Sequence, residues 1–132
     1  MRHAFVSYAT ADSRAALAAC EAISALGIRL WLDVDEVSAR AAWRDAVQLG
    51  IRDARVMLVV LGGGWEGSPA CRYELAVALE HGRPLIAMRL PEHSGRVPPV
   101  LPADTEIVSA ASLGAAAAAV AARLAATRYS GF

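Results

Sequence analysis

Among the carboxylates of this sequence, Glu74 has the position best suited to chemistry. A helix is predicted from Ser68-Pro69 to His81. At about 100° per residue, its sheet-facing apolar stripe consists of Cys71, Leu75 and Ala78. Glu74 lies at the edge of this stripe, where a carboxylate is costly unless it has water, a partner or a function. Two interpretations stay open, a functional carboxylate and a partly solvated residue paired with Arg72 or another arginine.

Other catalytic arrangements find little support. His3, His81 and His93 are isolated in the sequence, so we expect no metal site. Neither Ser7 nor Ser68 belongs to a nucleophile-elbow sequence. Cys20 and Cys71 have no C-x-x-C spacing, which fits a reducing compartment. Because the N-terminus lacks the apolar core of a signal peptide, we expect a cytoplasmic protein.

Composition excludes two further classes of partner. The 132 residues carry 13 basic and 13 acidic side chains, and every basic residue is an arginine placed singly, so we expect no nucleic acid partner. The alanine-rich segment 110–127 is short, weakly hydrophobic and interrupted by Arg123, so we expect no membrane span. We interpret it as a helix lying on the domain, and low-complexity disorder is the alternative.

Strand and helix patterns alternate along the whole chain, which we interpret as one domain, residues 1–132. Strands are predicted at 4–8, 28–32, 56–61, 85–90 and 106–109. Residues 10–13 are predicted to cap a first helix that runs to Leu26, and further helices are predicted at 41–53, 69–81 and 112–127. Such alternation predicts a flavodoxin-like α/β three-layer sandwich with a five-stranded parallel sheet in the order 2-1-3-4-5.

In that order, a crevice opens at the carboxyl ends of the first and third strands. The segments 8–12 and 62–68 are expected to line it. A phosphoacceptor receiver would need acidic residues at these strand ends and a lysine, but the chain contains no lysine. A flavodoxin would need a glycine-rich phosphate loop after the first strand, and segment 8–12 has no glycine. Both functions are therefore excluded.

Three segments together resemble the Toll/interleukin-1 receptor (TIR) domain across nearly the whole chain. They are His3–Tyr8 followed by Asp12, Gly27–Asp33 continuing to Trp43–Val47, and Ala54–Leu61 followed by Ser68 and Cys71–Leu75. TIR domains have the architecture deduced above. Some are docking scaffolds in innate immune signalling, and others cleave NAD+ between nicotinamide and ribose with a glutamate that corresponds to Glu74.

The resemblance thus implies an NAD+ nucleosidase that uses NAD+ as substrate, needs no cofactor and acts as an effector of bacterial immune defence. The alternative is a noncatalytic adaptor. With Glu74 as the catalytic residue, the walls of the substrate site would be Ser7, Tyr8, Thr10, Asp33, Trp43, Ser68 and Cys71. Trp43 has an equally weighted interpretation as a core anchor of the second helix.

The resemblance also implies self-assembly with other TIR domains through the loop Val34 to Trp43. We interpret the chain as a module of a larger sensor protein. Three departures from the family pattern bear on activity. Arg40 stands where the loop usually has glycine, and Ala70 stands where an aromatic residue is common. Gly62-Gly63-Gly64 replaces a Ser-Pro-like turn, which predicts a looser floor of the crevice.

Overall fold

Five parallel strands form the sheet of this computed structural model, which describes residues 2–32, 40–93 and 95–126. The strands are β1 (Arg2–Ser7), β2 (Leu30–Leu32), β3 (Ala54–Leu61), β4 (Leu85–Arg89) and β5 (Glu106–Ser109). Their order is β2-β1-β3-β4-β5, as the sequence predicts. At the carboxyl end of β1, Ser7 pairs with Val59 of β3, so these two strand ends are neighbours.

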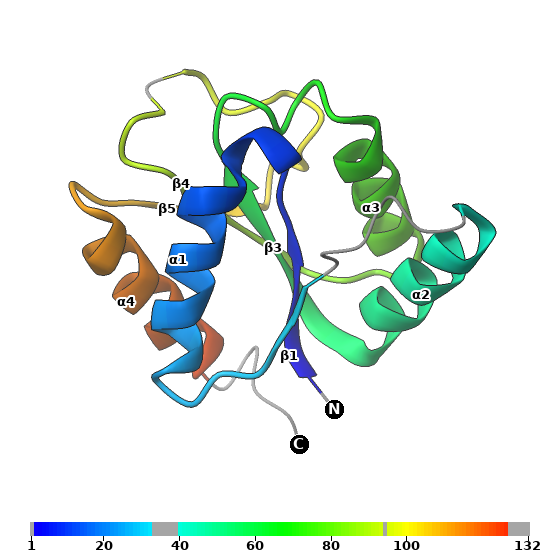
Figure 1. Ribbon diagram of the computed structural model, residues 1–132, viewed down its shortest axis with the longest axis horizontal. Helices are drawn as coiled ribbons and strands as arrows, with labels where there is room; N and C mark the ends of the chain where they lie inside the picture. Colours follow the sequence, from blue (N-terminus) through cyan, green and yellow to red (C-terminus); the bar gives the residue numbers. More distant parts are fainter. Residues whose placement is uncertain (1, 33–39, 94, 127–132) are drawn as a thin grey trace.

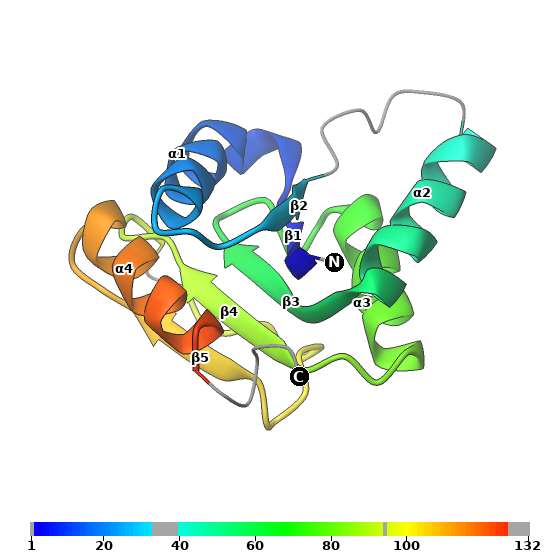
Figure 2. The same ribbon diagram turned by 90° about the horizontal axis from the view of Figure 1, so that it is seen from below.

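Helices cover both faces of the sheet. The elements are the short 3-10 helix η1 (Thr10–Asp12) and the α-helices α1 (Ser13–Ser24), α2 (Arg40–Asp53), α3 (Pro69–Glu80) and α4 (Leu113–Leu124). Figure 2 shows α1 and α4 on one face and α2 and α3 on the other. The expected three-layer sandwich is therefore confirmed.

The central strand β3 supplies both halves of the core. Val56, Leu58 and Val60 pack into the cluster beneath α1 and α4, whereas Met57, Val59 and Leu61 pack into the cluster beneath α2 and α3. All six side chains are buried. This is the two-sided burial that an unbroken apolar run predicts for a central parallel strand.

Several element bounds differ from the predicted ones by one to three residues, and β3, for example, begins at Ala54 instead of Val56. The edge strand β2 begins at Leu30 instead of Ile28, and β1 ends at Ser7, so Tyr8 already belongs to the following loop. The capping expected from segment 10–13 is wrong in detail, because the Asp12 side chain makes no capping hydrogen bond to α1. Its carboxylate instead binds a distant loop, described below.

The alanine-rich segment forms an ordered helix. Its buried face consists of Ala116, Ala117, Val120, Ala121 and Leu124, and it packs in the same cluster as Ala16 and Ala19 of α1. Small side chains on both helices permit their close approach. The helical interpretation of this segment is confirmed over residues 113–124. Within the described ranges, no helix is both long and apolar enough to cross a membrane.

Candidate functional site

The loops after β1, β3 and β4 lie at the same edge of the sheet, at the top of Figure 1. The loop between β3 and α3 is tied to the end of β1 by Trp65. Its indole Nε1 donates a 3.0 Å hydrogen bond to Ser7 Oγ. Both side chains are fully buried. Ser7, predicted to bind substrate, therefore has a structural role, because its hydroxyl accepts a hydrogen bond from Trp65.

A second bond ties the same loop to η1. The backbone N–H of Gly64 donates to Asp12 Oδ2 at 3.1 Å. A Cβ atom on Gly62 would overlap the Asp12 carboxylate, so any other residue there would force either the loop or the Asp12 side chain to shift. The looser crevice floor expected from Gly62-Gly63-Gly64 stays a prediction, and these contacts tie the turn to Asp12. Gly62 and Gly64 let the loop lie against Asp12, whose carboxylate accepts the Gly64 N–H.

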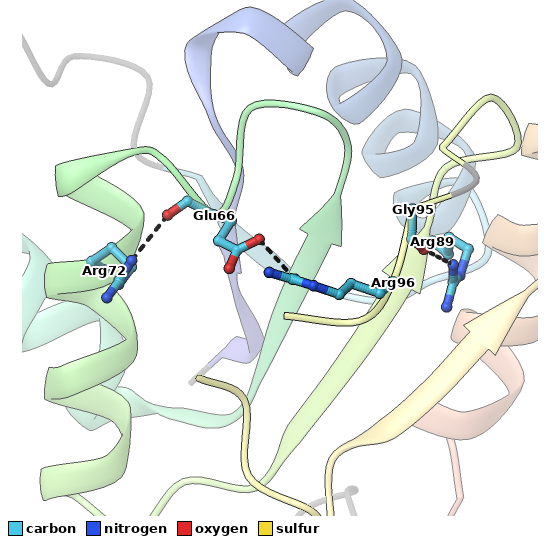
Figure 3. A network of polar contacts seen from close by, with 5 residues as sticks. All are labelled: Glu66, Arg72, Arg89, Gly95 and Arg96. Carbon is cyan, nitrogen blue, oxygen red and sulfur yellow. Dashed lines mark hydrogen bonds and ion pairs between the residues drawn. The ribbon is translucent and has the colours of Figure 1, made fainter. Parts of the chain in front are cut away.

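Arginines connect the outer parts of these loops, as Figure 3 shows. Arg96 Nη1 lies 3.4 Å from Glu66 Oε1, and Arg72 Nη1 donates to the Glu66 carbonyl oxygen at 3.1 Å. Arg89 donates to the carbonyl oxygen of Gly95. The Arg96 and Glu66 side chains are 68% and 45% exposed, so their ion pair adds little stability. The pair links the β4–β5 connection to the β3–α3 loop at the surface.

The start of α3 follows the predicted cap. Ser68 Oγ accepts a 3.2 Å hydrogen bond from the backbone N–H of Cys71, and Pro69 occupies the first turn, where its missing N–H costs nothing. Gly82, with φ of +66°, follows the end of the helix. The side chain of Cys71 is 1% exposed and packs in the core beneath α2 and α3. Ser68 and Cys71 therefore both have structural roles at the helix start.

Glu74 is more deeply buried than its place at the edge of the apolar stripe predicts. It is 4% exposed, and its neighbours on α3, Cys71, Leu75 and Ala78, are buried with it. Among the described residues, the buried polar or charged side chains are those of Ser7 and Glu74. The partial solvation expected of a rim residue is therefore not found, while a pairing of Glu74 with an arginine stays a prediction. Arg72 Nη1 donates to the Glu66 carbonyl oxygen.

Trp43 on α2 packs against α3. Its ring centroid lies 5.6 Å from that of Tyr73, with the planes tilted by 41°. Trp43 is half-buried and belongs to the periphery of the core beneath α2 and α3. Its two interpretations were a wall of the site and an anchor of α2, and this contact supports the anchor. Its Nε1 is buried and makes no hydrogen bond to the described part of the chain.

Among the remaining candidates, the structure describes Tyr8 and Thr10. Tyr8 is half-buried and packs against the cluster beneath α1 and α4, on the opposite face from α3. Thr10 is exposed on η1. Asp33 and the loop segment 34–39 lie outside the described residues. The structure thus groups Ser7, Ser68 and Cys71 with the helix that carries Glu74.

Sequence reasoning missed Trp65 and the role of Asp12. The available signal was an aromatic residue inside a glycine-rich turn, Gly62 to Gly67, which is unusual unless the side chain has a place in the core. Together, Trp65 and Asp12 hold the loop that leads into α3. They therefore help to determine where the N-terminal half of α3, including Glu74, lies relative to the sheet.

Comparisons with known proteins agree with this architecture. The crystal structure of the TIR domain of the Toll-related receptor TRR-2 from Hydra magnipapillata matches with a TM-score of 0.65 and 16% identity, covering 81% of this chain and 83% of that one. No curated protein matches the sequence. The family model described as "TIR domain" matches residues 4–125. This chain therefore belongs to the TIR domain family.

Proposed function

We propose that this TIR domain cleaves NAD+ at the bond between nicotinamide and ribose, with Glu74 as the catalytic residue. The observation that carries the proposal is the burial of Glu74, which is 4% exposed among apolar neighbours on α3. Removing a carboxylate from water is costly, and such groups are frequent at functional sites. The motif resemblance gives this glutamate the family's catalytic position.

The chemistry of the reaction explains why one carboxylate suffices. When the glycosidic bond breaks, its electron pair leaves with nicotinamide, which becomes neutral and needs no protonation. Positive oxocarbenium-like charge develops on the ribose. Glu74 would accept hydrogen bonds from ribose hydroxyls, stabilise this charge, and then orient a nucleophile at the anomeric carbon. Water as nucleophile gives ADP-ribose, and an atom of the same molecule gives a cyclic isomer.

Rigid support for the helix favours this role over a surface role. The loop before α3 is held by Ser7 and Asp12 through two hydrogen bonds to Trp65 and Gly64. The first turn is capped by Ser68. Catalytic carboxylates must be held within a fraction of an ångström of their working position. These contacts supply such support without using Glu74 itself.

TIR domains as a class interact with other TIR domains, and we extend the proposal to self-assembly of this chain. The loop Val34 to Trp43 would dock on a neighbouring copy and complete the substrate site, in a heterologous contact that can repeat. Specific activity is then expected to rise with protein concentration. Arg40→Glu is expected to reduce that rise. In a cytoplasmic bacterial setting, the enzyme would act as an effector of immune defence.

The proposal is tested by incubating the protein with NAD+ at several concentrations and separating the products by chromatography. Release of nicotinamide together with ADP-ribose or its cyclic isomer is expected. A folded protein that releases no nicotinamide at any concentration would contradict the enzyme function. If that same protein still associated with TIR domains, it would be the noncatalytic adaptor that the family resemblance also allows.

A further inference from the structure

The half-buried side chain of Tyr73 is turned toward α2 and is contacted there from several sides. Trp43 packs against its ring at a centroid distance of 5.6 Å. The guanidinium carbon of Arg44 lies 5.4 Å from the ring centroid, within the range of a cation–π contact. Gln48 Nε2 donates a 3.2 Å hydrogen bond to the Tyr73 hydroxyl. Three residues of α2 therefore hold one tyrosine of α3.

Gln48 extends this contact to the end of α3. Its Oε1 lies 3.4 Å from Nε2 of His81, the residue that follows the last turn of the helix. Because the Gln48 amide donates to Tyr73 with Nε2, its oxygen is free to accept from a His81 N–H. The hydrogen bonds of Gln48 thus join α2 to α3 at two points about two turns apart.

Tyr73 immediately precedes Glu74, so the two side chains leave the same stretch of backbone about 100° apart around the helix. On one side, Cys71, Leu75 and Ala78 pack in the core beneath the helix. On the other side, Tyr73 is held by α2. These two attachments together determine the rotation of α3 about its own axis. A rotation of about 20° would displace a carboxylate about 6 Å from the axis by roughly 2 Å.

We propose that Tyr73 is a positioning residue, which through its contacts with α2 sets the rotation of α3 and thereby the place of the Glu74 carboxylate. It does not itself touch the reacting atoms. The kinetic part of this inference rests on the proposed function. A displacement of about 1 Å in a catalytic group costs up to about 100-fold in rate, so the loss of these contacts is expected to lower kcat.

The kinetic test uses three variants of the full chain. Tyr73→Phe removes the hydroxyl and keeps the ring contacts, Gln48→Met removes the amide at similar length, and Tyr73→Leu removes the ring. Circular dichroism first verifies that all variants are folded. We then expect kcat to fall by about 3-fold for Tyr73→Phe and Gln48→Met and by at least about 10-fold for Tyr73→Leu, while KM stays within about 2-fold of wild type. Equal kcat in all three variants and wild type would overturn the proposal.

A double-mutant cycle separates positioning from general destabilisation. Glu74→Asp withdraws the carboxylate by one methylene group and is expected to leave a measurable residual rate. In that background, Tyr73→Leu is expected to have less than half its effect on log kcat, because the carboxylate is already displaced. As matched control, Glu106→Gln breaks the 2.5 Å ion pair with Arg123, which joins β5 to α4. Glu106→Gln is expected to change kcat only slightly and by the same factor with and without Glu74→Asp. A fully multiplicative effect of Tyr73→Leu would also overturn the proposal.

A structural readout tests the inference even if the chain does not cleave NAD+. The carboxyl carbon of Glu74 is followed by NMR in wild type, Tyr73→Phe and Gln48→Met, with the exposed carboxylate of Glu80 on the same helix as reference. The Glu74 resonance is expected to shift in both variants while that of Glu80 stays in place. An unchanged Glu74 resonance would contradict the positioning role, whereas absent nicotinamide release with a shifted resonance would contradict only the enzyme function.

Discussion

The indole of Trp65 donates its N–H to the hydroxyl of Ser7, 58 positions earlier in the chain, and both side chains are inaccessible to solvent. This bond joins the end of β1 to the loop that precedes α3. Ser7 therefore has a structural role in the folded domain that requires no ligand. Its Oγ accepts a hydrogen bond from Trp65, the largest of the fully buried side chains in the described part of the chain.

The Ser7–Trp65 bond predicts a characteristic pattern of stabilities. Ser7→Ala leaves the buried indole N–H without its acceptor and is expected to lower the free energy of unfolding by about 1–3 kcal/mol. Trp65→Phe removes the donor and leaves a partly filled space, so it destabilises as well. In the double variant, neither partner is left unsatisfied, and its loss is expected to be smaller than the sum of the single losses. Urea unfolding measures all four proteins, and strictly additive losses would contradict the coupling.

The glycine turn offers a matched pair of substitutions. A Cβ on Gly62 overlaps the Asp12 carboxylate, whereas a Cβ on Gly63 meets nothing within 4 Å. Gly62→Ala is therefore expected to cost about 1–3 kcal/mol, since either the loop or Asp12 must move. Gly63→Ala is expected to stay within about 0.5 kcal/mol of wild type. Thermal unfolding of both variants checks the prediction, and equal losses would show that Asp12 does not hold the turn closely.

Two helix-capping serines with the same local geometry allow effects on stability to be compared with effects on activity. Ser68 caps α3 and Ser112 caps α4, each accepting a 3.2 Å hydrogen bond from a backbone N–H three residues later. Replacement of either by alanine is expected to cost about 1 kcal/mol. Only Ser68→Ala is expected to lower NAD+ cleavage, because only α3 carries Glu74. If both variants lose activity in the same proportion at equal stability, the position of α3 is not what Ser68 contributes.

Burial raises the pKa of the Cys20 thiol from its usual 9.0 to about 12, because the thiolate would lose its hydration. The folded state thus keeps this proton at a pH where the unfolded state releases it. The contribution of Cys20 to stability is fully present below pH 9.0 and is lost between pH 9.0 and about 12, at up to about 1.4 kcal/mol per pH unit. The difference in unfolding free energy between wild type and Cys20→Ala is expected to shrink over this range. A constant difference from pH 8 to pH 11 would contradict it.

Much of the fold follows from local sequence, because alternating strand and helix patterns restrict a chain of this length to few topologies. The unbroken apolar run of β3 predicted its burial on both faces, and Ser68-Pro69 predicted the start of α3. These features depend on neighbours in sequence. For the same reason, the helical periodicity placed Glu74 next to the buried face of α3.

The contacts that support the site depend on residues far apart in the chain, and local patterns do not reveal them. Trp65 finds Ser7, and Gly64 finds Asp12, across separations of 58 and 52 positions. Asp12 has the residue type of a helix cap, and capping was accordingly predicted, but the carboxylate binds the loop instead. Likewise, the contact between Trp43 and Tyr73 requires the packing of α2 on α3. Each of these contacts depends on how distant parts of the chain pack together.

If the buried carboxylate of Glu74 is the catalytic group for NAD+ cleavage, the substitution Glu74→Gln must abolish that reaction. Glutamine keeps the size of the side chain and removes its charge, while Glu80→Gln makes the same change at an exposed position on the same helix. Nicotinamide release from NAD+ is measured for wild type and both variants at high protein concentration. We expect Glu80→Gln to keep the wild-type rate. We expect Glu74→Gln, still folded, to lose at least about 100-fold in rate, which corresponds to about 2.7 kcal/mol of transition-state stabilisation. A folded Glu74→Gln protein that releases nicotinamide at the wild-type rate would contradict this role of Glu74.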